Sequence, residues 1–290
     1  MQEIHGDLRF DRWIRVKPVV YYIMERQNED GGYTFAQWSE SSAQDTYLAL
    51  QILKILGTKP LYRERTIQFL KRLQNSDGSF DSIKVAYYVA ESLQELGSAP
   101  DRDVKQFIFS LQSPRGGFGS LDVDIEASSE IESTYLSLEL LKLLGEPIQP
   151  DKTVKFILGL KNPDGSFGIQ GYSGLASIYY ALASLKLLGF PVNSLYDTIK
   201  WIRDCEIPTG GFARTPNAFD AYLVIDDVYY GVKALEILNE AGQYSSQNLN
   251  IIGKFQNRNG GFRRSIFLGI STFEATYYAL SSLQATSRWA

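Results

Sequence analysis

Six tyrosines at matched positions are the residues whose type and spacing most clearly suggest a binding surface in this sequence. Each stands in a helical pattern such as STYLSLELLKLLG or SIYYALASLKLLG. They are Tyr47, Tyr87, Tyr135, Tyr179, Tyr229 and Tyr277. If these helices surround a common centre, the tyrosine faces suit an apolar chain or a cation. The alternative is structural, because matched tyrosines can brace a ring through their hydroxyl groups.

The residue three positions before each tyrosine lies on roughly the same helical face, and its type varies between repeats. These positions hold Gln44, Lys84, Glu132, Ala176, Asp226 and Glu274. A position whose residue differs between repeats indicates a functional site better than a position that holds the same residue in every repeat. Glu132 and Glu274 are therefore predicted to line the cavity with the tyrosines.

A repeated two-helix unit positions these residues. Its turn combines a glycine, which permits the left-handed backbone where a helix ends, with an aromatic that enters the core. The six turns are QNEDGGY (27–33), QNSDGSF (74–80), QSPRGGF (112–118), KNPDGSF (161–167), EIPTGGF (206–212) and QNRNGGF (256–262). Their aromatics are 38 to 50 residues apart, and a helical pattern precedes and follows each turn.

The first and last repeats resemble the middle ones, whereas an open solenoid carries polar capping repeats at its ends. We therefore expect an all-α protein, an α6/α6 toroid with inner and outer rings of helices, in which residues 1–290 form a single domain. The connections between turn and second helix are long in the third and fifth repeats, and long loops on one face usually carry function.

Composition limits the other classes of function. The chain has 44% hydrophobic and 21% charged residues, and its net charge of −4 gives no electrostatic reason to bind nucleic acid or an anionic membrane. Its one cysteine, Cys205, fits a reducing cytosol, so a cytoplasmic location is expected. No uncharged apolar run is long enough to predict a transmembrane helix.

The six turns, each followed by a T-Y-Y-A-L-like helix, resemble the superfamily of protein prenyltransferase β subunits and squalene/hopene-type terpene cyclases. The resemblance covers essentially the whole chain. It implies an α/α toroid with an isoprenoid, or another apolar small molecule, in its inner ring. A single toroid is similar to a prenyltransferase β subunit, whereas the cyclases pair two barrels. Because the β subunits work with a helical α subunit, the resemblance also allows for a helical partner here.

The zinc ligands of the prenyltransferases do not carry over to this chain. The family holds zinc through an Asp and a Cys at the start of the fifth inner helix and a His at the sixth. Asp226 occupies the Asp position, but Val228 and Ala275 stand where the Cys and the His belong. Zinc needs such nitrogen and sulfur ligands, so we expect no zinc.

Most of the residues that hold the diphosphate in the family are also replaced in this chain. Glu132 and Ala176 stand at the positions of a family Arg and His, while Arg214 matches an Arg after the fifth turn. The candidates for diphosphate binding are Lys84, Arg214, Arg263 and Arg264. A Mg²⁺ ion would offset the nearby carboxylates, although no motif requires one.

The cyclases use a D-x-D-D motif, in which burial and a neighbouring carboxylate keep an Asp protonated. The matching stretch here is VIDD (224–227), which makes Asp226, with Asp227 beside it, the candidate catalytic pair. Three functions are left open: an isoprenoid-binding prenyltransferase-like protein without the usual zinc, an acid-initiated cyclase that uses Asp226, and a non-catalytic lipid-binding or scaffold toroid.

Overall fold

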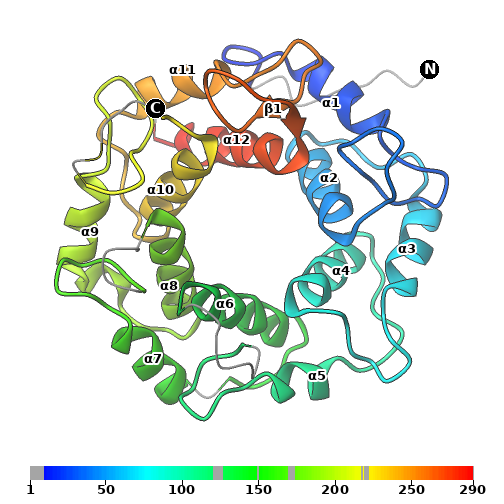
Figure 1. Cartoon of the computed structure of the whole chain (residues 1–290), viewed down its shortest axis with the longest axis horizontal. Coiled ribbons are helices and arrows are strands. Elements are labelled where there is room, and N and C mark those ends of the chain that lie inside the picture. The colour runs from blue at the N-terminus through cyan, green and yellow to red at the C-terminus, as the bar shows by residue number, and fades with distance from the viewer. Residues whose placement is uncertain are drawn as a thin grey trace.

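The computed structural model describes residues 10–119, 127–148, 150–168, 174–216, 218 and 222–289. Within them, twelve α-helices alternate between an outer and an inner ring (Figure 1). The outer helices are α1 (Val16–Met24), α3 (Arg63–Arg72), α5 (Lys105–Ser110), α7 (Pro150–Gly159), α9 (Tyr196–Arg203) and α11 (Ser245–Gly253). The inner helices are α2 (Ala43–Ile55), α4 (Ile83–Glu95), α6 (Ala127–Leu143), α8 (Leu175–Leu187), α10 (Ile225–Ile237) and α12 (Phe273–Thr286). The short elements are the 3₁₀ helix η2 (Val192–Ser194) and an antiparallel pair of strands, β1 (Phe262–Arg263) and β2 (Ser271–Thr272).

The inner helices form a closed ring. Each packs against its two inner neighbours, and α12 closes the ring by packing against α2 (Figure 1). Each outer helix contacts the inner helix that follows it in the chain. The predicted all-α toroid is confirmed.

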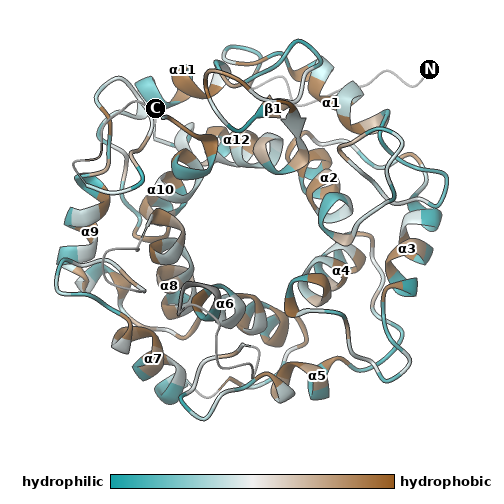
Figure 2. Ribbon diagram, viewed as in Figure 1, coloured by the Kyte–Doolittle hydropathy of each residue, from teal (hydrophilic) through white to brown (hydrophobic). Residues whose placement is uncertain are grey.

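The hydrophobic core lies between the two rings, and the outer helices turn their hydrophobic sides toward it (Figure 2). The leucines six positions after the matched tyrosines enter this layer and are at most 2% exposed: Leu53, Leu93, Leu141, Leu185, Leu235 and Leu283. The aromatics of the turns do the same, at 0 to 3% exposure: Tyr33, Phe80, Phe118, Phe167, Phe212 and Phe262. In the described part of the chain, no helix is both long and apolar enough to cross a bilayer.

Each repeated turn docks onto the beginning of the next outer helix. The glycines of these docking points have φ between +90° and +107°: Gly31, Gly78, Gly116, Gly165, Gly210 and Gly260. A Cβ added at Gly78 would lie 2.5 Å from the carbonyl oxygen of Asp103, just before α5. The last turn reaches around to the first outer helix, because a Cβ at Gly260 would lie 2.2 Å from backbone atoms of Pro18 in α1. The turns therefore close the outer ring as well.

The glutamine that opens a turn ties it to the next outer helix. Gln74 Nε2 donates to the carbonyl oxygens of Gly78 and Arg102, at 3.1 and 3.0 Å, and its Oε1 accepts from the N–H of Arg102 at 2.9 Å. Gln256 makes the equivalent bonds to Gly260 and to Arg15 before α1. The turn is thus a joint between neighbouring repeats as well as a helix stop.

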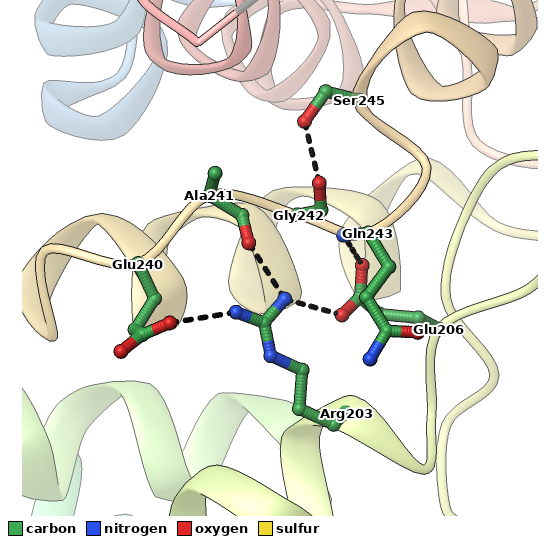
Figure 3. Close-up of polar contacts among 7 residues, drawn as sticks. All are labelled: Arg203, Glu206, Glu240, Ala241, Gly242, Gln243 and Ser245. Carbon is green, nitrogen blue, oxygen red and sulfur yellow. Dashed lines mark hydrogen bonds and ion pairs between the residues drawn. The ribbon is translucent and has the colours of Figure 1, made fainter.

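In the fifth turn a glutamate replaces this glutamine, and an ion-pair cluster replaces the amide bonds (Figure 3). The Glu206 side chain is only 1% exposed and pairs with Arg203 at 2.7 Å. Its other oxygen accepts from the N–H of Gln243 at 2.6 Å. Arg203 also donates to Glu240 at 2.8 Å and to the Ala241 carbonyl at 2.6 Å, which joins α9 to the segment after α10.

Candidate functional site

Threonines in three of the inner helices, α2, α6 and α12, orient matched tyrosines toward the central cavity. Thr46, Thr134 and Thr276 accept hydrogen bonds from the backbone N–H groups of the turn aromatics, at 2.9 to 3.0 Å. Each threonine immediately precedes a matched tyrosine. Its bond to the turn therefore fixes the rotation of the helix and directs the next side chain toward the centre.

All six matched tyrosines line the central cavity, and four more join them. These ten residues, the tyrosine cluster, are Tyr47, Tyr87, Tyr88, Tyr135, Tyr179, Tyr180, Tyr229, Tyr230, Tyr277 and Tyr278. The second tyrosine of the T-Y-Y pattern was the signal in the sequence for the four that we did not predict. Glu132 and Glu274 lie on the wall of the same cavity.

The tyrosine rings fill most of the space inside the toroid. Tyr229 stacks on Tyr278 with ring centroids 4.3 Å apart, and Tyr47 stacks on Tyr88 at 5.0 Å. The remaining central cavity has a volume of about 90 Å³. That volume is well below the roughly 300 Å³ at which ligand pockets begin. Burial raises the pKa of Tyr47 and Tyr229 well above its usual value, so their hydroxyls stay neutral.

Hydroxyl groups and carboxylates form a continuous chain across the end of the cavity where the inner helices begin, which we call the mouth. The hydroxyl oxygen of Tyr180 lies 3.1 Å from Oε1 of Glu132 and 3.2 Å from the hydroxyl oxygen of Tyr230. The hydroxyl oxygen of Tyr230 lies 3.1 Å from that of Tyr278, which in turn lies 3.3 Å from Oε1 of Glu274. The diphosphate candidate Lys84 pairs with Glu132 at 2.8 Å.

At the opposite end, ion pairs join neighbouring inner helices. Lys54 of α2 pairs with Glu95 of α4. Beyond α12, Arg288 pairs with Glu236 of α10 at 2.6 Å.

A larger cavity lies beside the mouth, between the loops that precede α10 and α12. This rim pocket has a volume of about 440 Å³. Its lining includes Ile207, Phe212, Ala213, Arg214, Ala218, Tyr222, Leu223, Val224, Asp227, Arg264, Ser265 and Leu268. The two loops are bonded together, because the N–H of Ile225 donates to the Arg264 carbonyl at 2.9 Å and that of Ile266 to the Leu223 carbonyl at 3.2 Å.

The two adjacent aspartates have different surroundings. Asp226 pairs with Arg264, with the carboxylate oxygen 2.8 Å from the guanidinium nitrogen. Asp227 is 8% exposed and faces the rim pocket. Burial raises the pKa of Asp227 to about 6, with Arg214 opposing the shift and Asp226 adding to it. The pair therefore presents one carboxylate engaged in an ion pair and one buried carboxyl group with a raised pKa.

The four diphosphate candidates do not meet at one place. Arg214 and Arg264 both line the rim pocket. Lys84 is engaged with Glu132, on the other side of the mouth. Arg263 donates to the carbonyl oxygens of Lys254 and Ile266, both at 2.7 Å, and its guanidinium also bonds Asn257. The structure thus holds Arg263 within its own turn.

The two residues that the resemblance predicts at the family's Cys and His positions, Val228 and Ala275, are apolar and buried. Val228 is 0% exposed and Ala275 is 2% exposed, so neither position offers a ligand. Cys205 is buried in the core, where burial raises the pKa of its thiol, and His5 lies outside the described residues. Over the described ranges, no cluster of three or more His, Cys, Asp or Glu side chains could hold a metal ion. The residues present do not fit a family-type zinc site.

A closed double ring of helices with an aromatic interior defines an α/α toroid. Residues 10–85, 81–221 and 224–289 match the family model of the prenyltransferase alpha-alpha toroid domain, and the chain belongs to this family.

Among the relatives, the chain is 27% identical over 236 residues to the geranylgeranyl transferase type-1 subunit beta of Arabidopsis thaliana, which covers 70% of this chain and 60% of that protein. Its matches span only 37% to 60% of the length of the curated relatives.

Solved structures share the fold at low sequence identity. The Candida albicans protein geranylgeranyltransferase-I complexed with GGPP has a TM-score of 0.76 and 17% identity, over 96% of this chain and 92% of that one. The type II terpene cyclase MstE from Scytonema, in complex with geranylgeranyl dihydroxybenzoate, has a TM-score of 0.61 and 11% identity, over 93% and 94% of the two chains.

Proposed function

We propose that this protein is an isoprenoid-binding, prenyltransferase-like toroid that does not use zinc-thiolate chemistry. One observation carries the proposal: the rim pocket joins an apolar wall to the two guanidinium groups of Arg214 and Arg264. The family and the GGPP complex of a structural neighbour support the ligand class.

A prenyl diphosphate is an apolar chain with an anionic head group, and the rim pocket offers a match for both parts. Guanidinium groups bind phosphate oxygens through paired, charge-assisted hydrogen bonds. Phe212, Tyr222 and Leu268 supply apolar surface beside them. The volume of about 440 Å³ falls within the range of small-molecule sites, whereas the central cavity of about 90 Å³ does not. We therefore propose the rim pocket, rather than the tyrosine cluster, as the first binding site.

The chemistry of the acceptor differs from that of the zinc enzymes in this proposal. Without a Cys or a His at the positions of Val228 and Ala275, no metal lowers the pKa of an acceptor thiol there. Mg²⁺ carried by the diphosphate would offset the negative charge of Asp226 and Asp227. Because the Arabidopsis relative is a β subunit, the proposal also includes a second subunit.

Isothermal titration with geranylgeranyl diphosphate, with and without Mg²⁺, tests the binding site. We expect Arg214→Ala and Arg264→Ala each to weaken binding about 10- to 100-fold, as expected for the loss of charged hydrogen bonds of about 1.5–3 kcal/mol. Arg115→Ala is the matched control, since Arg115 pairs with Glu130 at the third repeat, outside the rim pocket. Absence of binding by the unchanged protein, or equal effects of all three substitutions, would contradict the proposal.

The small central cavity favours a second candidate, a non-catalytic toroid whose tyrosines act as its core. This protein would bind no prenyl diphosphate, and the same titration separates the two functions.

The cyclase alternative, with Asp226 as general acid, meets an obstacle in the ion pair with Arg264, because this contact occupies a carboxylate oxygen that would have to reach the substrate. Turnover of a polyprene that requires Asp226 would support it. Unchanged turnover in Asp226→Asn would exclude it.

A further inference from the structure

Exposed apolar side chains gather on the three loops that lead into α10, α12 and α2. In the described part of the chain, these loops carry five of the six most exposed large hydrophobic residues, at 67 to 98% exposure. The five residues, which we call the rim patch, are Trp38, Tyr222, Phe267, Leu268 and Ile270. The three inner helices are consecutive in the ring, because α12 packs against both α10 and α2 (Figure 1). Single exposed apolar residues are ordinary, but a group of them on neighbouring loops indicates a surface that binds something apolar.

Hydrogen bonds hold two of these loops in place, so the patch is presented on a fixed framework. Asn28 Nδ2 donates to the carbonyl oxygen of Ser39 at 3.1 Å. Asn257 Nδ2 donates to the carbonyl oxygen of Gly269 at 3.2 Å. The backbone of Trp38 has φ +70°, a left-handed conformation that is unfavourable for a bulky residue. The fold thus holds a strained tryptophan with its side chain in solvent, where its burial contributes nothing to stability.

The loop before α12 and the turn that leads into it carry a charge that suits an anionic surface. Residues 254–273 include no acidic residue and four basic ones, Lys254, Arg258, Arg263 and Arg264. Because the whole chain has a net charge of −4, any attraction to an anionic surface is local to this segment. Asp226 offsets Arg264, but the side chains of Lys254 and Arg258 are exposed. Basic groups beside exposed apolar side chains favour the interface of an anionic bilayer.

The shape of the rim patch favours a lipid surface over a folded partner. Its side chains protrude from the loops and bury little surface against their own protein. A folded partner would need a separate pocket for each of them, whereas fluid lipid closes around any protruding side chain. Trp and Tyr also prefer the boundary between head groups and hydrocarbon. Tyr222 and Leu268 line the rim pocket as well, so the patch continues into that cavity.

We propose that the rim patch docks this protein on the surface of a lipid bilayer that contains anionic lipids. The three loops enter the bilayer at the level of the head groups. Docking sets the rim pocket against the lipid, so an apolar ligand passes between bilayer and pocket without crossing water. The docking itself does not depend on the isoprenoid function, because it is a property of the loops alone.

Co-sedimentation of the full chain with vesicles of phosphatidylcholine and phosphatidylserine tests the docking. We expect the unchanged protein to sediment with these vesicles, and to sediment less with phosphatidylcholine alone or at high salt. Phe267→Ser and Ile270→Ser together should weaken binding about 10- to 100-fold, because each removes an apolar side chain that docking takes out of water. Neither residue lines the rim pocket, so titration with geranylgeranyl diphosphate should give the same result as before the change.

Tyr196→Ser is the matched control, since Tyr196 of α9 is 77% exposed but lies outside the three loops. This variant should sediment like the unchanged protein. Trp38 supplies a second measurement, because lipids with brominated acyl chains should quench its fluorescence. Trp38→Phe should remove that part of the quenching.

The docking is overturned if the chain stays in solution with both kinds of vesicle. It is also overturned if the variant with both serines binds as tightly as the unchanged protein, or if Tyr196→Ser weakens binding equally. Self-association through Phe267 and Ile270, without binding to vesicles, would assign the rim patch to a second copy of the chain instead.

Discussion

Replacing Gly260 with alanine is expected to destabilise the protein by about 2–6 kcal/mol. Gly260 has φ +95°, a conformation that costs an L-residue about 1–3 kcal/mol. The new Cβ would lie 2.2 Å from the backbone of Pro18, and overpacking of this kind costs about 1–3 kcal/mol more. Because Pro18 belongs to α1, the substitution separates the last turn from the first outer helix, at the point where the chain closes on itself.

Gly145→Ala is the matched control for this experiment. Gly145 also has positive φ, at +70°, but an added Cβ there would meet no atom within 4 Å. The Gly145→Ala variant should lose only about 1–2 kcal/mol of stability, the cost of the left-handed backbone to an L-residue. Urea unfolding of the two variants measures both losses. Equal losses would show that the contact between Gly260 and Pro18 does not contribute to closing the ring.

The toroid was predictable from the sequence because its chemistry is local and repeated. Gly78 and Phe80 of one turn serve the same purposes in all six, a left-handed backbone and a buried anchor, so six weak signals support one register. That register then identified the inner-facing tyrosines such as Tyr47. Closure was predictable from the similarity of the end repeats, since no polar caps appear.

The content of the cavity was not predictable from the register. The residue after a matched tyrosine is turned by about 100° around the helix, so Tyr180 and Tyr230 were not expected at the centre. In a narrow ring, two positions on each inner helix can reach the axis, and their rings occupy the space that an isoprenoid was expected to fill. The periodicity of the sequence predicts which way each side chain points from its helix, but it does not predict the radius of the ring.

The partners of the charged residues at the site were not predictable either, because they depend on contacts between loops that the repeat does not specify. Arg263 and Arg264 are adjacent in sequence, yet one bonds backbone carbonyls of its own turn and the other pairs with Asp226. The choice follows from the bonding of the two loops at Val224 and Ser265, far apart in the chain. Asp226 and Asp227 differ in the same way, because Asp226 pairs with Arg264 whereas Asp227 lines the rim pocket.

The second large effect is expected for Asp227→Asn, which should stabilise the protein at pH 8 by about 3 kcal/mol. Burial raises the pKa of Asp227 to about 6, from an ordinary value of 3.8. The folded state therefore binds this proton more tightly than the unfolded state does. The free energy of unfolding falls as pH rises from about 4 to about 6, by about 1.4 kcal/mol for each pKa unit. Asparagine carries no such charge. The free energy of unfolding of the variant should therefore equal that of the unchanged protein at pH 4 and exceed it by about 3 kcal/mol at pH 8.

Asp226→Asn provides the control of opposite sign. Asp226 pairs with Arg264, whose side chain is 63% exposed, so its loss should cost about 0–1 kcal/mol at pH 8. Urea unfolding at pH 4 and pH 8 measures both variants. A destabilised Asp227→Asn at pH 8 would mean that the Asp227 carboxylate gains more from Arg214 than burial costs it. A stabilised one would mean that the fold tolerates an unfavourable charge in the rim pocket, as expected of a group kept for binding or catalysis.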